Sequence, residues 1–99
     1  MFTESVRVVA RITARPDKIG ELKTILLELV GATRREEGCV GYQLLQNRMD
    51  PTDFTFVEEW LSDVAIDAHL ATSHVQTAFA KAQPLLAAAP DIRRYSVCA

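Results

Sequence analysis

The sequence predicts an α+β fold of the ferredoxin-like type, in which the elements follow one another as β-α-β-β-α-β. Segments in which apolar and polar residues alternate indicate strands at four places. A long segment with apolar residues three and four positions apart indicates the first helix, and capping residues place a second helix, split in two, after the third strand. Right-handed crossovers then put the helices on one face of a four-stranded antiparallel sheet.

Length and composition predict one domain that spans residues 1–99, since 99 residues with 48% hydrophobic content leave no room for a second core. The net charge of -2 gives no basic surface for nucleic acid or an anionic membrane, so we expect neither as a partner. Residues 1–13 lack the apolar core of a signal peptide, and no apolar run reaches membrane-spanning length. We therefore expect a cytoplasmic protein.

The first strand is predicted over residues 6–15, and a proline-aspartate pair ends it. The helix that follows runs to about Glu36 and has one apolar stripe, made of Ile19, Leu22, Leu26, Leu29, Val30 and Thr33. Gly38 is a natural C-terminal stop for this helix. Glu36 and Glu37 just before it are unfavourable to the helix dipole, and nothing in the sequence explains this pair.

The second strand is predicted over residues 39–47, where Gly41 suggests a bulge or a close approach by a bulky group. Its alternation places one set of side chains on a common face, namely Val40, Tyr42, Leu44 and Gln46. The loop over residues 48–53 contains an Asp-Pro turn signal. It joins this strand to the next as a hairpin.

The third strand, over residues 54–61, places a carboxylate on the same face as three aromatic side chains, namely Glu58 with Phe54, Phe56 and Trp60. Ser62 is a natural N-cap for a short helix to about residue 71. Ser73 has capping-box spacing to Gln76, which makes His74 the first residue inside the next helix. Pro84 interrupts that helix, and the last strand is predicted over residues 91–98.

The two histidines are candidate bases. The partial positive charge of a helix N-terminus disfavours imidazolium, so His74 should stay neutral near pH 7 and act as a base or hydrogen-bond partner. A solvated histidine near a cap is the alternative interpretation. His69 lies in the middle of its helix and could face the sheet, where it would be either catalytic or a structural histidine at the edge of the core.

No metal site is expected from the sequence. Cys39 and Cys98 show no metal-ligand spacing, and as residues of strands at opposite sheet edges they should be reduced and unbridged. His69 and His74 are five residues apart and would point about 140° apart on one continuous helix. The spacing therefore argues against zinc or iron.

Both faces of the first and third strands carry large apolar residues, such as Val8 and Ile12 against Val9, and Phe56 against Val57. A sheet with one face in water should alternate more cleanly. A second copy packed sheet to sheet would cover the apolar face, so we expect a homodimer with a closed barrel at its centre. A monomer with an unusually apolar sheet face is the alternative.

Three segments, EEGCVGYQL, FVEEW and DAHLATSH, resemble in their order and spacing the antibiotic biosynthesis monooxygenase (ABM) family. This resemblance covers nearly the whole chain. It implies a dimeric α+β barrel with a ligand cavity between the sheet and the helices of each subunit. The best-understood members of the family oxidise polycyclic phenols, anthrones or quinols with molecular oxygen and use no flavin, haem or metal, so the resemblance implies no cofactor.

Such chemistry needs a base, an apolar cavity that excludes water and a donor that holds the developing anion. His74 or His69 is the candidate base, and Arg94 or Tyr95 the candidate anion donor. Four aromatic residues are candidates for the wall around an aromatic substrate, although ordinary core packing is the alternative for each: Trp60, Phe56, Tyr42 and Phe79. The predicted function is a cofactor-independent monooxygenase of a quinol- or anthrone-like substrate.

Other branches of the family suggest other functions. The haem-degrading branch has an asparagine, a tryptophan and a histidine where this sequence has Ala10, His69 and Phe79, so haem degradation is not expected. A second branch processes a phosphorylated quorum-sensing signal by what resembles enol-type isomerisation, for which Arg11, Arg93 and Arg94 would supply the cations. A non-catalytic dimer that binds a small ligand is the third possibility.

Overall fold

The computed structural model describes residues 5–99. Its elements follow one another in the predicted order, with the second helix split: β1 (Val6–Thr13), α1 (Ile19–Arg34), β2 (Cys39–Gln46), β3 (Asp53–Trp60), α2 (Asp63–Leu70), α3 (Ser73–Ala82), a short 3₁₀ helix η1 (Gln83–Leu85) and β4 (Asp91–Tyr95). The predicted ferredoxin-like fold is confirmed. In this part of the chain, no helix has the length and apolar character needed to cross a membrane. The signal-peptide prediction concerns residues 1–13, of which 1–4 lie outside the described residues.

The four strands form one antiparallel sheet in the order β2-β3-β1-β4. The second and fourth strands therefore lie at opposite edges, as predicted. The last strand is shorter than predicted and ends at Tyr95, so Cys98 lies beyond it, and Cys39 and Cys98 are both free thiols. In the registers of the two central pairings, Glu58 of β3 lies opposite Val8 of β1 and Tyr42 of β2. This places the Glu58 side chain in the middle of the sheet.

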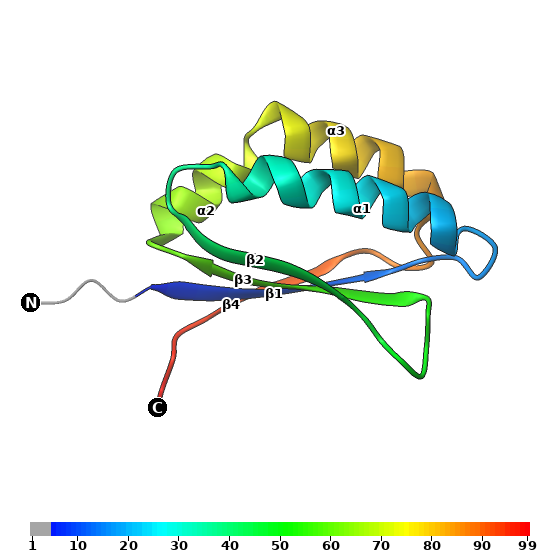
Figure 1. The fold of residues 1–99 in the computed structure, drawn as a ribbon, viewed down its shortest axis with the longest axis horizontal. Helices are drawn as coiled ribbons and strands as arrows, with labels where there is room; N and C mark the ends of the chain where they lie inside the picture. The colour runs from blue at the N-terminus through cyan, green and yellow to red at the C-terminus, as the bar shows by residue number, and fades with distance from the viewer. Residues whose placement is uncertain (1–4) are drawn as a thin grey trace, which may run out of the picture.

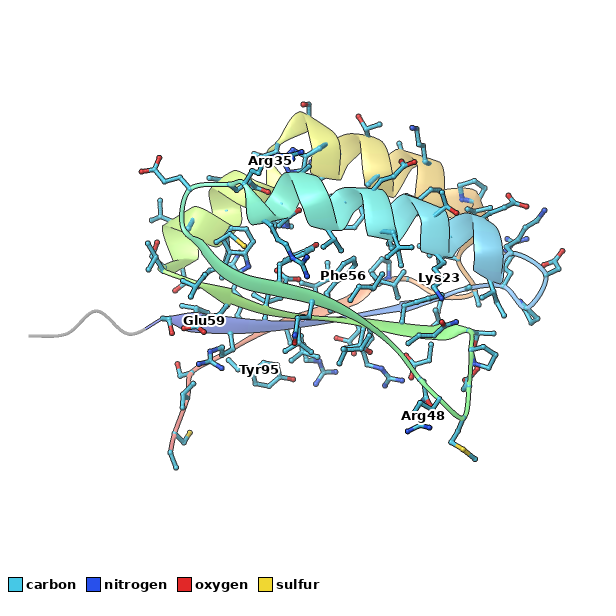
Figure 2. The ribbon with its side chains drawn as sticks, in the orientation of Figure 1. Lys23, Arg35, Arg48, Phe56, Glu59 and Tyr95 are labelled. Atoms are coloured by element: carbon cyan, nitrogen blue, oxygen red, sulfur yellow. The ribbon has the colours of Figure 1, made fainter. Side chains whose placement is uncertain are left out.

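All three α-helices cover the same face of the sheet, so that the molecule has two layers (Figure 1). The core lies between the layers. Its largest fully buried side chains come from the strands and from each helix: Trp60, Phe54, Leu22, Leu26, Ile66, Val8, Val75 and Thr33. Figure 2 shows Phe56 pointing from the sheet toward the helices, whereas Tyr95 lies on the opposite face, which we call the open face. After β4 the chain turns away from the helices.

The predicted bulge in β2 is confirmed as a register shift between Cys39 and Gly41. The extra residue moves Val40 off the helix-facing side, and its side chain is 53% exposed. Its assignment to the face of Tyr42 was therefore wrong, because strict alternation fails across a bulge. Cys39 packs against the core instead.

The helix starts also differ in one place. Ser62 caps α2 as predicted, since its Oγ accepts a hydrogen bond from the backbone N–H of Ala65 at 3.2 Å. The cap of α3 is Thr72 rather than Ser73, because the Thr72 hydroxyl accepts from the N–H of Val75. His74 is thus the second residue of α3. It stays in the first helical turn.

Candidate active site

A small cavity lies between the sheet and the helices. Its volume is about 20 Å³, which is room for about one water molecule. The polar or titratable side chains that line it are Tyr42, Glu58 and His69; Phe56, Phe79 and aliphatic side chains from every layer complete the wall. The cavity is therefore apolar, with three proton-carrying groups that face it from β2, β3 and α2.

Glu58 is a carboxyl group held inside the core. Its side chain is 5% exposed, and its Oε1 accepts a hydrogen bond from the indole Nε1 of Trp60 at 2.8 Å. Burial raises the pKa of Glu58 to about 7, although the Trp60 hydrogen bond lowers it and the charge of Glu36 adds to the rise. A carboxyl group with a pKa near 7 holds its proton in about half of the molecules at neutral pH.

The aromatic side chains pack around this carboxyl group. The ring of Tyr42 lies 4.9 Å from that of Phe56 and 6.5 Å from that of Trp60, measured between centroids. Burial raises the pKa of Tyr42 above its ordinary value, so its hydroxyl keeps its proton throughout the physiological range. Trp60 itself is fully buried, and its ring lies 4.6 Å from that of His69, centroid to centroid, with a tilt of 39° between the two ring planes. It supports Glu58 and His69 from behind the cavity wall.

The two histidines meet on one carboxylate oxygen. Nδ1 of His69 lies 2.6 Å from Oε2 of Glu36, and Nε2 of His74 lies 2.7 Å from the same oxygen. The side chains of His69 and Glu36 are 6% and 12% exposed, and that of His74 is 30% exposed. With neutral rings, each histidine donates one N–H to Glu36, and the second ring nitrogen of His69 is left as an acceptor.

The break between α2 and α3 produces this arrangement. The angle of about 140° between His69 and His74 holds for one continuous helix and does not apply here, because α2 ends at Leu70 and α3 begins at Ser73, the split that the sequence predicted. The change of direction turns both rings toward the end of α1. Glu36 reaches them because the following Gly38 packs against Ala65 of α2, where an added Cβ would lie 2.7 Å from the Ala65 Cβ.

The same three residues are the group that could hold a metal ion, since their ligand atoms all lie within 4.8 Å of one another. Neighbouring ligands of one ion with bonds of about 2 Å lie roughly 3 Å or more apart. The separations of 2.6 and 2.7 Å are shorter than this and typical of charge-assisted hydrogen bonds. The geometry therefore fits a hydrogen-bonded His-Glu-His cluster better than a metal site.

Residues 5–81 match the family model described as antibiotic biosynthesis monooxygenase, which is more than half of the chain. The chain belongs to the ABM family. The matched segment contains Glu36, Glu58, Trp60 and both histidines, whereas Ile92 of the cavity wall lies beyond it.

Relatives of this ABM protein support the assignment. YcnE of Bacillus subtilis (strain 168), provisionally named a monooxygenase, is 33% identical over 85 residues, which are 86% of this chain and 90% of YcnE. Rv0793 of Mycobacterium tuberculosis, named in the same way, is 33% identical over 73 residues, 74% of this chain and 71% of its own. The crystal structure of PA3566 from Pseudomonas aeruginosa is similar with a TM-score of 0.93 and 30% identity, and covers 100% of this chain and 99% of that one.

The structure of this ABM domain does not bring all the predicted site residues together. Tyr42, Phe56, Phe79 and His69 line the cavity, whereas His74 lines a separate hollow of about 230 Å³ between α1 and α3. Tyr95 lies on the open face and is 46% exposed. It therefore lies across the sheet from the cavity.

The arginines do not converge on the cavity either. Arg94 lies on the helix side, but its guanidinium donates to Asp63 at 3.0 Å and to Asp67 at 2.6 Å, both on α2. Arg11 and Arg93 lie on the open face, where Arg93 donates to Asp91. The three cations expected for a phosphorylated signal thus lie on two faces of the sheet.

Two residues that the sequence interpretation did not select complete the site, namely Glu36 and Glu58. The available signal for Glu36 was its unfavourable place at the C-terminal end of a helix. For Glu58 it was the position of an acid between Phe56 and Trp60 on the buried face of a strand.

Proposed function

We propose that this ABM protein is a cofactor-independent monooxygenase that oxidises a small quinol-like aromatic substrate with molecular oxygen, with His69 as the base. The observation that carries the proposal is the placement of His69. It lines an apolar cavity, and its Nδ1 is held by the Glu36 carboxylate. The ring nitrogen that is not bound to Glu36 is then free to take a proton from a substrate, and the imidazolium that results is stabilised by the adjacent carboxylate.

Deprotonation makes a quinol electron-rich enough to reduce oxygen directly. In the overall reaction, a hydroquinone and one O₂ give a hydroxylated quinone and one water. One oxygen atom enters the ring as a new C–O bond, the other leaves as water, and the substrate supplies both electron pairs. No external reductant is consumed, so the protein has to supply only the base, the apolar surroundings and the orientation.

The size of the cavity favours a single-ring quinol over a tricyclic anthrone. At about 20 Å³ it must widen even for one ring. The lining residues that remain partly exposed are Leu70, Phe79 and Ile92, at the ends of α2 and α3 and on the edge strand β4. A ligand that enters between these side chains reaches His69 with the smallest disturbance of the core.

A homodimer is part of the same proposal. Large apolar side chains lie exposed on the open face, among them Leu45, Val57 and Tyr95, with exposed fractions of 38% to 48%. A second copy packed sheet to sheet would bury them. We also propose a cytoplasmic location, which suits the two free cysteines.

The test is oxygen uptake by purified protein freed of metal with a chelator, with a panel of methylated hydroquinones and anthrone. We expect uptake above autoxidation and a hydroxyquinone product one oxygen atom heavier than the quinone. The His69→Ala variant should fall to the autoxidation rate, whereas His74→Ala should retain part of the activity because Glu36 still holds His69. Equal rates for wild type and His69→Ala, or no uptake across the panel, would contradict the proposal.

A further inference from the structure

An oxygenation that passes through an anionic substrate needs a hydrogen-bond donor inside the cavity. Arg94 and Tyr95 do not supply one, because the first is bound to two aspartates and the second lies on the open face. Besides the base His69, the polar groups on the cavity wall of residues 5–99 are Tyr42 and Glu58. One of them is a carboxyl group in apolar surroundings, which is a donor only when it is protonated.

We propose that Glu58, as a neutral carboxylic acid, donates a hydrogen bond from Oε2 to the substrate oxygen on which negative charge develops, and is therefore a second catalytic residue. This inference rests on the function proposed above. It narrows the substrate class to aromatic rings whose reactive oxygen becomes an oxyanion. This oxyanion would contact both an imidazole and a carboxylic acid.

Trp60 decides which oxygen of Glu58 carries the proton. An indole N–H is a donor only, so the oxygen it contacts at 2.8 Å, Oε1, must act as an acceptor. The carbonyl oxygen of a neutral acid is a stronger acceptor than its hydroxyl oxygen, so the hydrogen bond from Trp60 to Oε1 favours the proton on Oε2. Within residues 5–99 the Glu58 side chain makes one hydrogen bond, which it accepts from Trp60. Its Oε2 therefore remains free for a ligand in the cavity that Glu58 lines.

The surroundings of Glu58 favour the neutral acid. In the described part of the chain, no lysine, arginine or histidine forms an ion pair with it. Val8, which lies opposite Glu58 on β1, is apolar. The titratable groups that surround Glu58 come from the other elements: Tyr42 and Cys39 of β2, Glu36 after α1, His69 of α2 and, across β1, Arg94 of β4. The one lasting cation among them, Arg94, is bound to Asp63 and Asp67. Burial and the charge of Glu36 keep the pKa of Glu58 near 7.

The direction of the pH dependence identifies Glu58. A donor that must be protonated loses activity as the pH rises through 7, whereas a histidine base gains activity as the pH rises. Tyr42 cannot produce a loss near pH 7, since burial raises its pKa further above the ordinary value of 10.0. Relative to Glu58→Gln, in which the contribution of the histidine base is the same, the wild-type activity should fall about tenfold between pH 6 and pH 8 if the neutral acid is the active form.

The experiment compares wild type with Glu58→Gln and Glu58→Met. The glutamine accepts from Trp60 and donates through its amide at every pH, so the ratio of its rate at pH 8 to its rate at pH 6 should be about tenfold higher than the same ratio for wild type. The methionine has similar volume but no donor, and its rate at pH 6 should be lower by roughly a hundredfold. The control is Glu59→Gln, which removes a carboxyl group from the open face of the same strand and should leave the wild-type pH profile. A parallel fall in Glu58→Gln, or a wild-type rate in Glu58→Met, would overturn the proposal.

A binding measurement separates this inference from the proposed reaction. The probe is 2,4-dinitrophenol, which is ionised throughout this pH range and resembles the oxyanion. Its dissociation constant should rise about tenfold from pH 6 to pH 8 for wild type, and at pH 6 Glu58→Met should bind it at least tenfold more weakly than wild type. If this binding result were obtained without oxygen uptake, it would support Glu58 as a hydrogen-bond donor and contradict the proposed monooxygenase reaction. Equal affinities of wild type and Glu58→Met at pH 6 would reject the donor, whatever the oxygen uptake.

Discussion

The indole nitrogen of Trp60 donates a hydrogen bond to the carboxyl group of Glu58 at 2.8 Å, and the two side chains are 0% and 5% exposed. They are two residues apart on β3 and therefore project to the same side of the sheet. The hydrogen bond satisfies the indole, which needs a partner when buried. It also stabilises ionised Glu58, but less than burial destabilises it, so the pKa of Glu58 is raised to about 7.

The first prediction is a loss of stability as the pH rises. Glu58 has a folded-state pKa of about 7 against 4.5 for the free side chain, so the folded protein binds the proton more tightly than the unfolded chain. The folded state therefore loses stability between about pH 4.5 and pH 7 because of this group, and the free energy of unfolding should fall by about 2 kcal/mol between pH 5 and pH 8 relative to Glu58→Gln. Urea unfolding at both pH values measures the difference. If the free energy of unfolding of wild type relative to Glu58→Gln were the same at both pH values, Glu58 would be solvated in the folded protein.

The second prediction concerns Trp60→Phe. The phenyl ring fills most of the indole volume but donates no hydrogen bond, so ionised Glu58 loses its partner and its pKa should rise above 7. The variant should lose about 2 kcal/mol of stability from the unsatisfied carboxyl and the smaller ring. A carboxyl-carbon NMR titration of Glu58 gives the pKa directly. The same substitution in a Glu58→Gln background serves as the control, because there it should leave the pH dependence of stability unchanged.

Much of this site could be predicted from the sequence because it depends on local patterns. Alternation along β3 correctly placed Phe54, Phe56, Glu58 and Trp60 on one face, and the cap at Ser62 correctly started α2. The fold followed from the order of such elements. Where a strand is predicted correctly, its alternation also predicts which of its side chains face the core.

The contact between Glu36 and the histidines was not predictable in this way. It joins residues 33 and 38 positions apart, and depends on how the turn after α1 packs against α2. The two-residue break between α2 and α3 brings together two rings that their spacing on one continuous helix would have pointed apart. Tyr95 was chosen as an anion donor for its chemistry, but the parity of β4 places it on the open face. Long-range packing and strand parity, rather than residue type, decide these cases.

The third prediction tests the role of Glu36 as a positioning residue. In Glu36→Gln the amide has one acceptor oxygen and no charge, so it holds the His69 ring less firmly and does not stabilise its imidazolium form. We expect kcat of oxygen uptake to fall by roughly 10²-fold, with a smaller change in KM. The neighbouring Glu37→Gln is the matched control, because Glu37 is exposed and should give wild-type kinetics. Imidazole nitrogen NMR of His69 should show a changed tautomer population in Glu36→Gln. A wild-type kcat in that variant would remove Glu36 from the mechanism.

The fourth prediction concerns the open face. Val57 lies there at the centre of the sheet, opposite Val9 of β1, and is 38% exposed. A charge at this position should prevent sheet-to-sheet association, because it would be buried without a partner in the dimer. We expect wild type to sediment at twice the chain mass of 11.0 kDa and Val57→Asp at the chain mass. Val64→Asp, on a 75% exposed residue of α2, should sediment as wild type does. Wild type at the single-chain mass would contradict the dimer.

The fifth prediction links the fold to the site through Gly38. Its φ of +88° is in the region that favours glycine, and an added Cβ would lie 2.7 Å from the Cβ of Ala65. Gly38→Ala should therefore lose about 2 kcal/mol or more of stability. Because Gly38 holds the turn that carries Glu36 against α2, kcat should fall as well. Gly31→Ala provides the contrast, since nothing lies within 4 Å of its Cβ in α1 and alanine there should gain up to about 1 kcal/mol.

A second substitution separates the two causes of the Gly38 effect. Ala65→Gly removes the atom that the new Cβ would meet but leaves the positive φ. If the steric contact dominates, the Gly38→Ala, Ala65→Gly double variant should recover kcat and part of the stability, after correction for the cost of glycine in α2. If the backbone conformation dominates, the loss of stability in the double variant should be no smaller than the sum of the losses in the two single variants. Recovery of kcat without full recovery of stability would show that the distance from Glu36 to His69 is set by the close packing of Gly38 on α2.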